Sequence, residues 1–540
     1  MAISAKRSGP ALAGQDPRAH DHRTPSKRTR EPALRGADDH GLERFEWLVL
    51  AALGAVSCWV IAISLYYATT HGRIWTGIDG EFSVDQLQYL AWIRDASHHG
   101  LASDLFVLRP TPHDYLQPVF AISGGLVAVG VAPWLALLLW KPVAIAALFL
   151  AIRAWCRRLL EGRWERRAAL MLALFGASYG VQGDEWLPFL SWGYPETLLA
   201  VAALVASLLA YERAWREGRG LLVAPALGLL ASWFHPWQGE LLIVIVVAVE
   251  LALARRPRAG GVSRLVLPAL TVGATALPLA YYAILGHADL AWRLGQGALK
   301  HSFPLSILLV PLIPLLVAAA LAYLERPTGF LPAAARAWPL AALVLWALNQ
   351  TGFGGAPQHA WGGITVPLAV LAVQGVQRTG LGPLPARRWL AALAVAALTI
   401  PATAYMLIDA PRFIRPSGES QNLIRSSEYQ AFRYLASAPV AGGVLATPWL
   451  GDAVPGETGR RTYASDDWRW SQPDPAGRAA AARRLIYGRM PPPAARAFVL
   501  GTGVRFVLQN CRSRADLRRL LGPIVRSVHR FGCAAVYEVA

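Results

Sequence analysis

Two acids in one polar segment are the first candidates for chemistry. In TGIDGEFSVDQLQYLAWIRD, Asp79 and Asp85 lie close together in sequence, beside aromatic residues and next to an apolar run. A carboxylate in such a place can deprotonate an acceptor hydroxyl or bind a hard divalent cation such as Mg²⁺ or Mn²⁺. The plainer interpretation is that both acids solvate a surface helix, with Asp85 facing the positive end of the helix dipole. Leu87, Leu90 and Ile93 fall at helical spacing and predict an amphipathic helix here.

Two further segments carry polar residues that suit a sugar-like ligand. QGDEWLPFLSWGYPET places Asp184 and Glu185 among aromatic side chains, although an aromatic belt at a membrane interface has the same composition. In SWFHPWQGE, His235 stands where two apolar runs meet. An ionisable group is costly there and is therefore a functional candidate. The alternative is a turn caused by the following proline, in which the histidine is only solvated.

Three cations are candidates for holding an anionic group such as a lipid phosphate: Lys141, Lys300 and His301. Lys141 lies inside an apolar run, so its ammonium must pair with an acid or extend toward the interface. The ordinary alternative for Lys300 is anchoring at the membrane surface.

The elements that position these residues are expected to be membrane helices. The chain has 540 residues, of which 54% are hydrophobic and 16% charged, and its repeated apolar runs of about 20 residues are long enough to span a bilayer. The net charge of +18 falls largely in arginine-rich loops between these runs, so we expect no nucleic-acid partner. The sequence contains no P-loop, no GxSxG motif of serine hydrolases, no HExxH motif of zinc proteases and no dinucleotide-binding fingerprint.

Charge in the loops predicts the topology. The segment 116–132 either spans the membrane or lies in the interface. If it lies in the interface, every second loop is arginine-rich, as expected for cytoplasmic loops. The N-terminus is then cytoplasmic, the C-terminus is outside, and there are eleven spans: 47–68, 134–154, 168–181, 193–210, 221–234, 241–254, 265–285, 304–323, 338–350, 362–376 and 389–408.

We therefore predict a polytopic α-helical membrane protein in three parts. Residues 1–44 form a disordered basic cytoplasmic arm. Residues 45–408 form the transmembrane domain, whose first outer loop is 69–133. Residues 409–540 form a small extracytoplasmic α/β domain, with strands near 444–446, 504–508 and 534–539 and helices near 476–487, 494–500 and 514–521. If this part is extracytoplasmic, a disulfide between Cys511 and Cys533 is plausible.

The first outer loop resembles that of the GT-C superfamily of membrane glycosyltransferases, such as protein O-mannosyltransferases and aminoarabinose transferases. The resemblance rests on Asp85, Gln86 and Tyr89, on Gly100, and on the proline-led segment 117–120. In the family pattern a second acid often follows the first, and Gln86 stands at that position here. This difference puts a metal site in the loop in doubt.

The resemblance implies that Asp85 is the general base that activates an acceptor hydroxyl, with Tyr89 and the Asp184–Glu185 region near the substrate. The implied donor is a sugar on polyprenyl phosphate, attacked with inversion, and the acceptor is a glycan, lipid or protein. Because of their charge and their expected position on the outer side of the membrane, Lys141, Lys300 and His301 are expected to hold the donor phosphate. The protein is expected in the plasma (inner) membrane of a bacterium. The alternatives are a carrier or flippase for a lipid-linked or anionic solute, and a non-catalytic scaffold with the same fold.

Overall fold

The computed structural model describes residues 41–176, 183, 186–254, 265–298, 304–351, 356–379, 388–417, 419–466 and 471–540. Residues 45–540 form one compact unit, and this unit is the subject below. The predicted arm 1–44 lies almost wholly outside the described residues.

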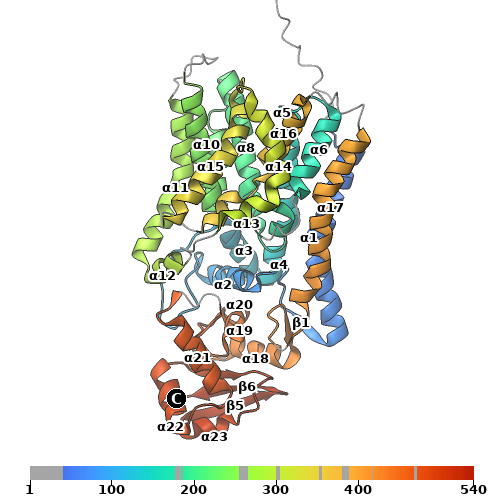
Figure 1. The fold of residues 1–540 in the computed structure, drawn as a ribbon. Helices are drawn as coiled ribbons and strands as arrows, with labels where there is room; N and C mark the ends of the chain where they lie inside the picture. Colours follow the sequence, from blue (N-terminus) through green and yellow to red (C-terminus); the bar gives the residue numbers. More distant parts are fainter. Residues whose placement is uncertain are drawn as a thin grey trace, which may run out of the picture. The chain divides into compact units, whose positions relative to one another are not determined.

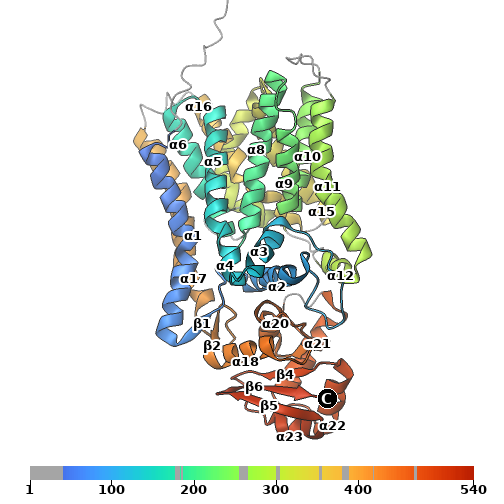
Figure 2. The ribbon, with the colours of Figure 1, turned by 180° about the vertical axis from the view of Figure 1, so that it is seen from behind.

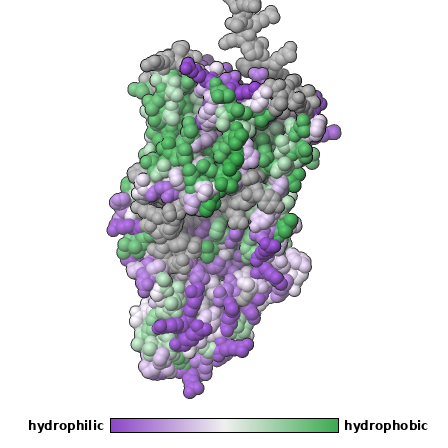
Figure 3. Space-filling view, in the orientation of Figure 1, coloured by the Kyte–Doolittle hydropathy of each residue, from purple (hydrophilic) through white to green (hydrophobic). Residues whose placement is uncertain are grey.

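Long apolar helices form one end of the unit (Figure 1). Among the described residues, seven segments are long and apolar enough to cross a membrane. They are α1 (Arg44–His71), Pro133–Leu159 (α4, Pro133–Leu138, and α5, Trp140–Leu159), α8 (Pro195–Glu217), α11 (Val266–Ala288), Leu305–Leu324 (α13 to η2), α15 (Phe330–Gln350) and α17 (Arg388–Ile414). Apolar residues cover this part of the surface in Figure 3. The chain is therefore a multi-pass membrane protein.

Four shorter helices pack among the long ones. They are α6 (Arg163–Phe175), α9 (Val223–Phe234), α10 (Pro236–Ala252) and α16 (Thr365–Arg378). Each of the eleven predicted spans coincides with a described helix. The count of eleven crossings stays a prediction, because these four helices have 13, 12, 17 and 14 residues.

The first loop lies across one end of the bundle, which we call the loop face (Figure 2). It contains β1 (Arg73–Trp75), α2 (Ser83–His99) and α3 (Pro118–Ala128). The apolar residues expected on one side of α2 are buried, namely Leu87, Leu90 and Ile93. With 11 residues, α3 is about 16 Å long, too short for a bilayer core of about 30 Å. Its length fits the interfacial position predicted for 116–132.

The C-terminal region packs against the loop face. Its helices are α18 (Ser426–Ser437), α19 (Pro448–Gly451), α20 (Ala453–Thr458), α21 (Pro475–Ile486), α22 (Pro492–Thr502) and α23 (Leu517–Leu521). Its strands are β3 (Val444–Leu445), β4 (Phe506–Gln509), β5 (Val525–Phe531) and β6 (Ala534–Val539), in the order β3-β4-β6-β5. The β3–β4 pair is parallel and the other pairs are antiparallel. A disulfide joins Cys511 to Cys533.

A second, two-stranded sheet ties the first loop to the C-terminal region. β1 follows α1, and it pairs antiparallel with β2 (Leu423–Arg425), which follows α17. The backbone N–H of Thr76 extends the pairing by donating to the Asn422 carbonyl at 3.0 Å. Farther along the loop, Arg94 Nε donates to the Gly456 carbonyl at 2.6 Å. The first loop is therefore held between the helix bundle and the C-terminal region.

Candidate active site on the loop face

Asp85 lies in the first turn of α2 and points toward the start of α8. The Tyr194 hydroxyl donates a hydrogen bond of 2.8 Å to Asp85 Oδ2. Asp85 is half-buried, and this hydrogen bond holds its carboxylate in place. A carboxylate in this setting can accept a proton from a hydroxyl that approaches it.

Asp79, by contrast, is enclosed. Its side chain is buried, and its Oδ2 lies 2.5 Å from Nζ of Lys141 on α5. Burial raises the pKa of the Asp79 carboxyl, and the Lys141 ammonium offsets part of that rise. Asp79 thus forms an internal ion pair that links the first loop to α5, and its predicted part in catalysis stays a prediction.

The predicted phosphate-binding role of Lys141 stays a prediction, and its ammonium already has partners within the protein. Besides Asp79, Lys141 Nζ donates to the Ser57 carbonyl at 3.1 Å and to the Ser191 carbonyl. An ammonium group has three N–H donors, and these partners occupy them. The apolar surroundings of Lys141 had indicated that it must pair, and the partner is an acid of the protein.

Gln86 replaces the second acid of the family pattern and joins two segments of the site. Its Oε1 accepts the backbone N–H of Asp79 at 2.9 Å. Its amide lies so close to Gly80 and Gly193 that a Cβ on either glycine would meet Gln86 Nε2, at 2.2 and 1.6 Å respectively. Gly193 also has a φ of 102°, which other residues rarely adopt. The two glycines thus allow Gln86 to pack between the first loop and the turn before α8.

Glu196 is a site residue that the sequence analysis missed. It lies in the first turn of α8 and is 4% exposed. Its carboxylate lies near the Tyr89 hydroxyl, and Asp85 lies near enough to both to interact electrostatically. Burial, together with these two acids, raises the pKa of the Tyr89 hydroxyl well above its usual range. Placing a carboxylate at the start of an apolar run costs free energy. The position of Glu196 at the start of such a run could therefore have marked it as a functional candidate in the sequence.

Aromatic rings hold Tyr89 in position. Its ring stacks on Phe120 of α3 with centroids 4.7 Å apart, and it meets Tyr194 edge to face at 6.4 Å. Trp92, one turn farther along α2, packs against both Tyr89 and Phe120. The predicted substrate residue Tyr89 therefore lies in the same cluster as Asp85, between α2, α3 and α8.

His235 belongs to a different cluster. It precedes α10, and its Nδ1 is hydrogen-bonded to Gln238. Its ring lies 4.8 Å from Trp237 and 5.3 Å from His359. The predicted substrate residues Asp184, Glu185, Lys300 and His301 lie outside the described residues.

The described residues around Asp85 do not fit a bound divalent metal. Asp79 is already neutralised by Lys141, and Gln86 supplies an amide where the family pattern has an acid. Within the described ranges, the group of His, Cys, Asp and Glu side chains whose ligand atoms converge is Asp95, His99 and His113. This group lies at the other end of α2.

The sequence matches no protein-family model and no curated protein significantly. Solved structures do match in fold. One is the archaeal oligosaccharyltransferase AglB from Archaeoglobus fulgidus, in complex with an inhibitory peptide and a dolichol-phosphate. Its TM-score is 0.50 at 14% identity, over 92% of this chain and 74% of AglB.

A second match is the arabinofuranosyltransferase AftD from Mycobacteria, with a TM-score of 0.50 and 15% identity over 93% of this chain. The match spans 42% of AftD, less than half of that protein. A third is ArnT from Cupriavidus metallidurans, with a TM-score of 0.47 and 13% identity over 91% of this chain and 97% of ArnT. AglB and AftD are GT-C membrane glycosyltransferases, and the present chain shares their fold.

Proposed function

We propose that the protein is a GT-C-type glycosyltransferase. It would move a sugar from a polyprenyl-phosphate donor to a hydroxyl of a glycan, lipid or protein acceptor on the extracytoplasmic side of the plasma membrane. The observation that carries the proposal is the half-buried Asp85 carboxylate, fixed by Tyr194 at 2.8 Å on the loop face of a GT-C fold. AglB, which shares the fold, is in complex with a dolichol-phosphate, and this supports the donor class.

In the proposed reaction, Asp85 is the general base. The acceptor hydroxyl gives its proton to the Asp85 carboxylate while its oxygen forms a bond to the anomeric carbon of the sugar. The bond between that carbon and the donor phosphate oxygen breaks, and the electron pair leaves on the phosphate. Attack opposite to the leaving group inverts the anomeric configuration.

Tyr194 and Glu196 have supporting roles in this proposal. The Tyr194 hydroxyl, which donates to Asp85 Oδ2, holds the Asp85 carboxylate for the acceptor. Glu196 lies near the Tyr89 hydroxyl, and Tyr89 would form the wall of the acceptor site beside Asp85. Asp79 and Lys141 keep the loop against the bundle. No step in this scheme uses a metal ion.

Native mass spectrometry of the detergent-purified protein tests the donor class first. We expect a co-purifying polyprenyl phosphate, bare or carrying a sugar. The reaction is then followed as release of polyprenyl phosphate from that donor after addition of cell-envelope extract as acceptor. Repeated preparations that hold bulk phospholipid alone, and show no release, would contradict the proposal.

Asp85→Asn identifies the base. The change removes the proton acceptor and keeps the shape, so the release rate should fall by about 10²–10⁴-fold. Asp409→Asn is the matched control, because Asp409 lies on α17 in an ion pair with the exposed Arg412. A carrier would move the lipid across vesicles without releasing polyprenyl phosphate. A non-catalytic scaffold would give the wild type and Asp85→Asn the same background rate.

A further inference from the structure

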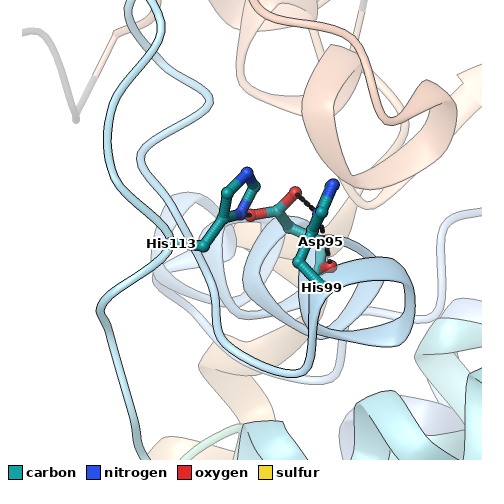
Figure 4. Close-up of side chains that lie close together, drawn as sticks. All are labelled: Asp95, His99 and His113. Atoms are coloured by element: carbon teal, nitrogen blue, oxygen red, sulfur yellow. Dashed lines mark hydrogen bonds and ion pairs between the residues drawn. The ribbon is translucent and has the colours of Figure 1, made fainter.

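A second cluster of ionisable residues lies at the C-terminal end of α2, where the proposed reaction does not use it (Figure 4). Asp95 and His99 are four residues apart on one face of the helix, and His113 comes from the loop that returns toward α3. His99 Nδ1 lies 3.0 Å from Asp95 Oδ1, and His113 Nδ1 lies 3.0 Å from Asp95 Oδ2. The two imidazole rings stack with centroids 3.7 Å apart.

The backbone builds this cluster. Gly100, with a φ of 80°, ends α2 directly after His99 and lets the chain turn back. An antiparallel bridge between Ala102 and Tyr115 then closes the loop and brings His113 over the helix end. The carboxylate of Asp95 is buried and accepts the backbone N–H of Ser103 at 2.6 Å. The acid is therefore immobilised before any ligand binds.

The imidazoles remain accessible from solvent. The side chains of His99 and His113 are 48% and 34% exposed, whereas that of Asp95 is 6% exposed. An ion can thus enter from the solvent side and meet a fixed carboxylate beneath two rings. All three ligand groups have an atom within 4.8 Å of the others, so small rotations of the rings are enough to close a coordination shell.

The donor set favours a particular class of ion. Two imidazoles and one carboxylate are a common protein ligand set for Zn²⁺, with a water in the fourth position. Ligand atoms at about 2.0–2.2 Å from one tetrahedral ion lie about 3.3–3.6 Å apart, somewhat farther than the 3.0 Å from each imidazole to its own Asp95 oxygen. Imidazole ligands suit zinc and its neighbours in the transition series better than Mg²⁺, Ca²⁺ or Mn²⁺.

The surrounding charges are mixed. Asp104 and Asp114 lie in the same loop, and each interacts with Asp289 at the start of α12 (Leu290–Ala298). Arg461 of the C-terminal region faces Asp95 and Asp104, but its guanidinium donates to the backbone carbonyls of Asp104 and Arg109. The loop itself also carries Arg109, so the acids Asp95, Asp104, Asp114 and Asp289 stand against the two guanidiniums of Arg109 and Arg461.

We propose that Asp95, His99 and His113 bind one divalent transition-metal ion of the zinc class. The ion would pin the end of α2 to the loop 100–117. That loop ends at Gln117, which caps α3, and it carries the carbonyls that Arg461 contacts. The metal would therefore act as a structural clip between α2, α3 and the C-terminal region, away from the reacting groups.

The test uses the full-length protein in detergent, stripped with a chelator and titrated with ZnCl₂. Calorimetry and thermal unfolding should show one bound Zn²⁺ and a higher melting temperature, with MgCl₂ giving neither. His113→Ala should weaken binding by at least about 10-fold. His98→Ala is the matched control, because His98 is the exposed neighbour of His99 and lies outside the cluster.

Cobalt gives a second readout that does not depend on stability. Co²⁺ in the site should produce visible absorption bands in the wild type and in His98→Ala, and these bands should be absent in His113→Ala and His113→Gln. Asp85→Asn should bind Zn²⁺ like the wild type, which separates this site from the proposed reaction. Absence of Zn²⁺ binding in the wild type, or equal binding by His113→Ala, would overturn the proposal. The imidazoles would then serve Asp95 as hydrogen-bond donors only.

Discussion

The Tyr194 hydroxyl donates a 2.8 Å hydrogen bond to Asp85 Oδ2 and so joins the first turn of α2 to the residue that precedes α8. A helix of the first loop and a helix of the bundle thus meet at one carboxylate. The hydrogen bond orients Asp85, the proposed general base, and leaves its negative charge in place.

Tyr194→Phe should lower the turnover rate by about 10-fold and lower the melting temperature by a few degrees. The substitution removes one hydrogen bond to a charged group, which contributes about 1.5–3 kcal/mol, and keeps the ring that packs on Tyr89 and Phe189. Release of polyprenyl phosphate measures the rate. Tyr66→Phe, at an exposed tyrosine of α1, is the control. Equal rates for both variants would show that Tyr194 does not position Asp85.

Lys141→Met should unfold the protein at markedly lower temperature. The change leaves the buried Asp79 carboxylate without its cation, and breaking a buried ion pair in this way costs about 3–5 kcal/mol. The double variant Asp79→Leu/Lys141→Met removes both charges and should recover much of the loss. Thermal unfolding in detergent measures both. If Lys141 instead held the donor phosphate, Lys141→Met would raise the KM for the donor and keep the wild-type melting temperature.

Gly193→Ala should disrupt the site, whereas Gly130→Ala should not. The two glycines have nearly the same backbone conformation, with φ values of 102° and 100°. They differ in surroundings, because a Cβ at Gly193 would overlap Gln86 and one at Gly130 meets nothing within 4 Å. Gly130→Ala should cost about 1–3 kcal/mol from backbone strain alone.

The additional loss in Gly193→Ala should depend on Gln86. We expect Gly193→Ala/Gln86→Ala to be more stable than Gly193→Ala, which a double-mutant cycle by thermal unfolding detects. If Gln86→Ala gave no relief, the close packing of Gln86 between Gly80 and Gly193 would not be what makes Gly193 necessary.

Glu457→Gln should flatten the pH dependence of stability. Burial in α20 raises the pKa of Glu457 to about 7, and Arg94 offsets part of the rise. A carboxyl with a higher pKa in the folded state than in the unfolded chain stabilises the fold at low pH, and this contribution is lost as pH rises through about 7. The wild-type melting temperature should therefore fall between about pH 5 and about pH 9 more steeply than that of Glu457→Gln.

The control for this prediction is Glu217→Gln, at an exposed glutamate of α8, which should keep the wild-type slope. A Glu457→Gln variant with the same slope as the wild type would show that Glu457 does not titrate in this range.

Much of the helical architecture was predictable, because it depends on local apolar runs and on charge in the loops. The spacing of Leu87, Leu90 and Ile93 predicted α2, and the short apolar run after Gln117 predicted an interfacial helix, which α3 matches in length. The three predicted C-terminal strands are observed as β3, β4 and β6. Strand β5 was missed because VRSVHRF has no buried residue and includes two arginines.

The site was less predictable, because its contacts join segments that are far apart in the chain. The sequence indicated that Lys141 needs a partner, but the partner is Asp79, which had been expected to act in catalysis. Tyr194 and Glu196 stand in a segment whose other acids, Asp184 and Glu185, attracted the prediction. Tyr194 and Glu196 reach Asp85 and Tyr89 because α8 packs near α2, and a local sequence pattern does not predict which helices pack together.

The pairing of β1 with β2 bears on the order in which the protein can mature. Thr76 bonds to Asn422 across 346 residues of sequence, so the ribosome makes the first loop long before it makes the loop's partner strand. Until α17 has been inserted and β2 has followed it, the segment that leads to Asp79 has no strand to pair with. The pairing that joins the first loop to the C-terminal region therefore forms only after α17 and β2 have been synthesised.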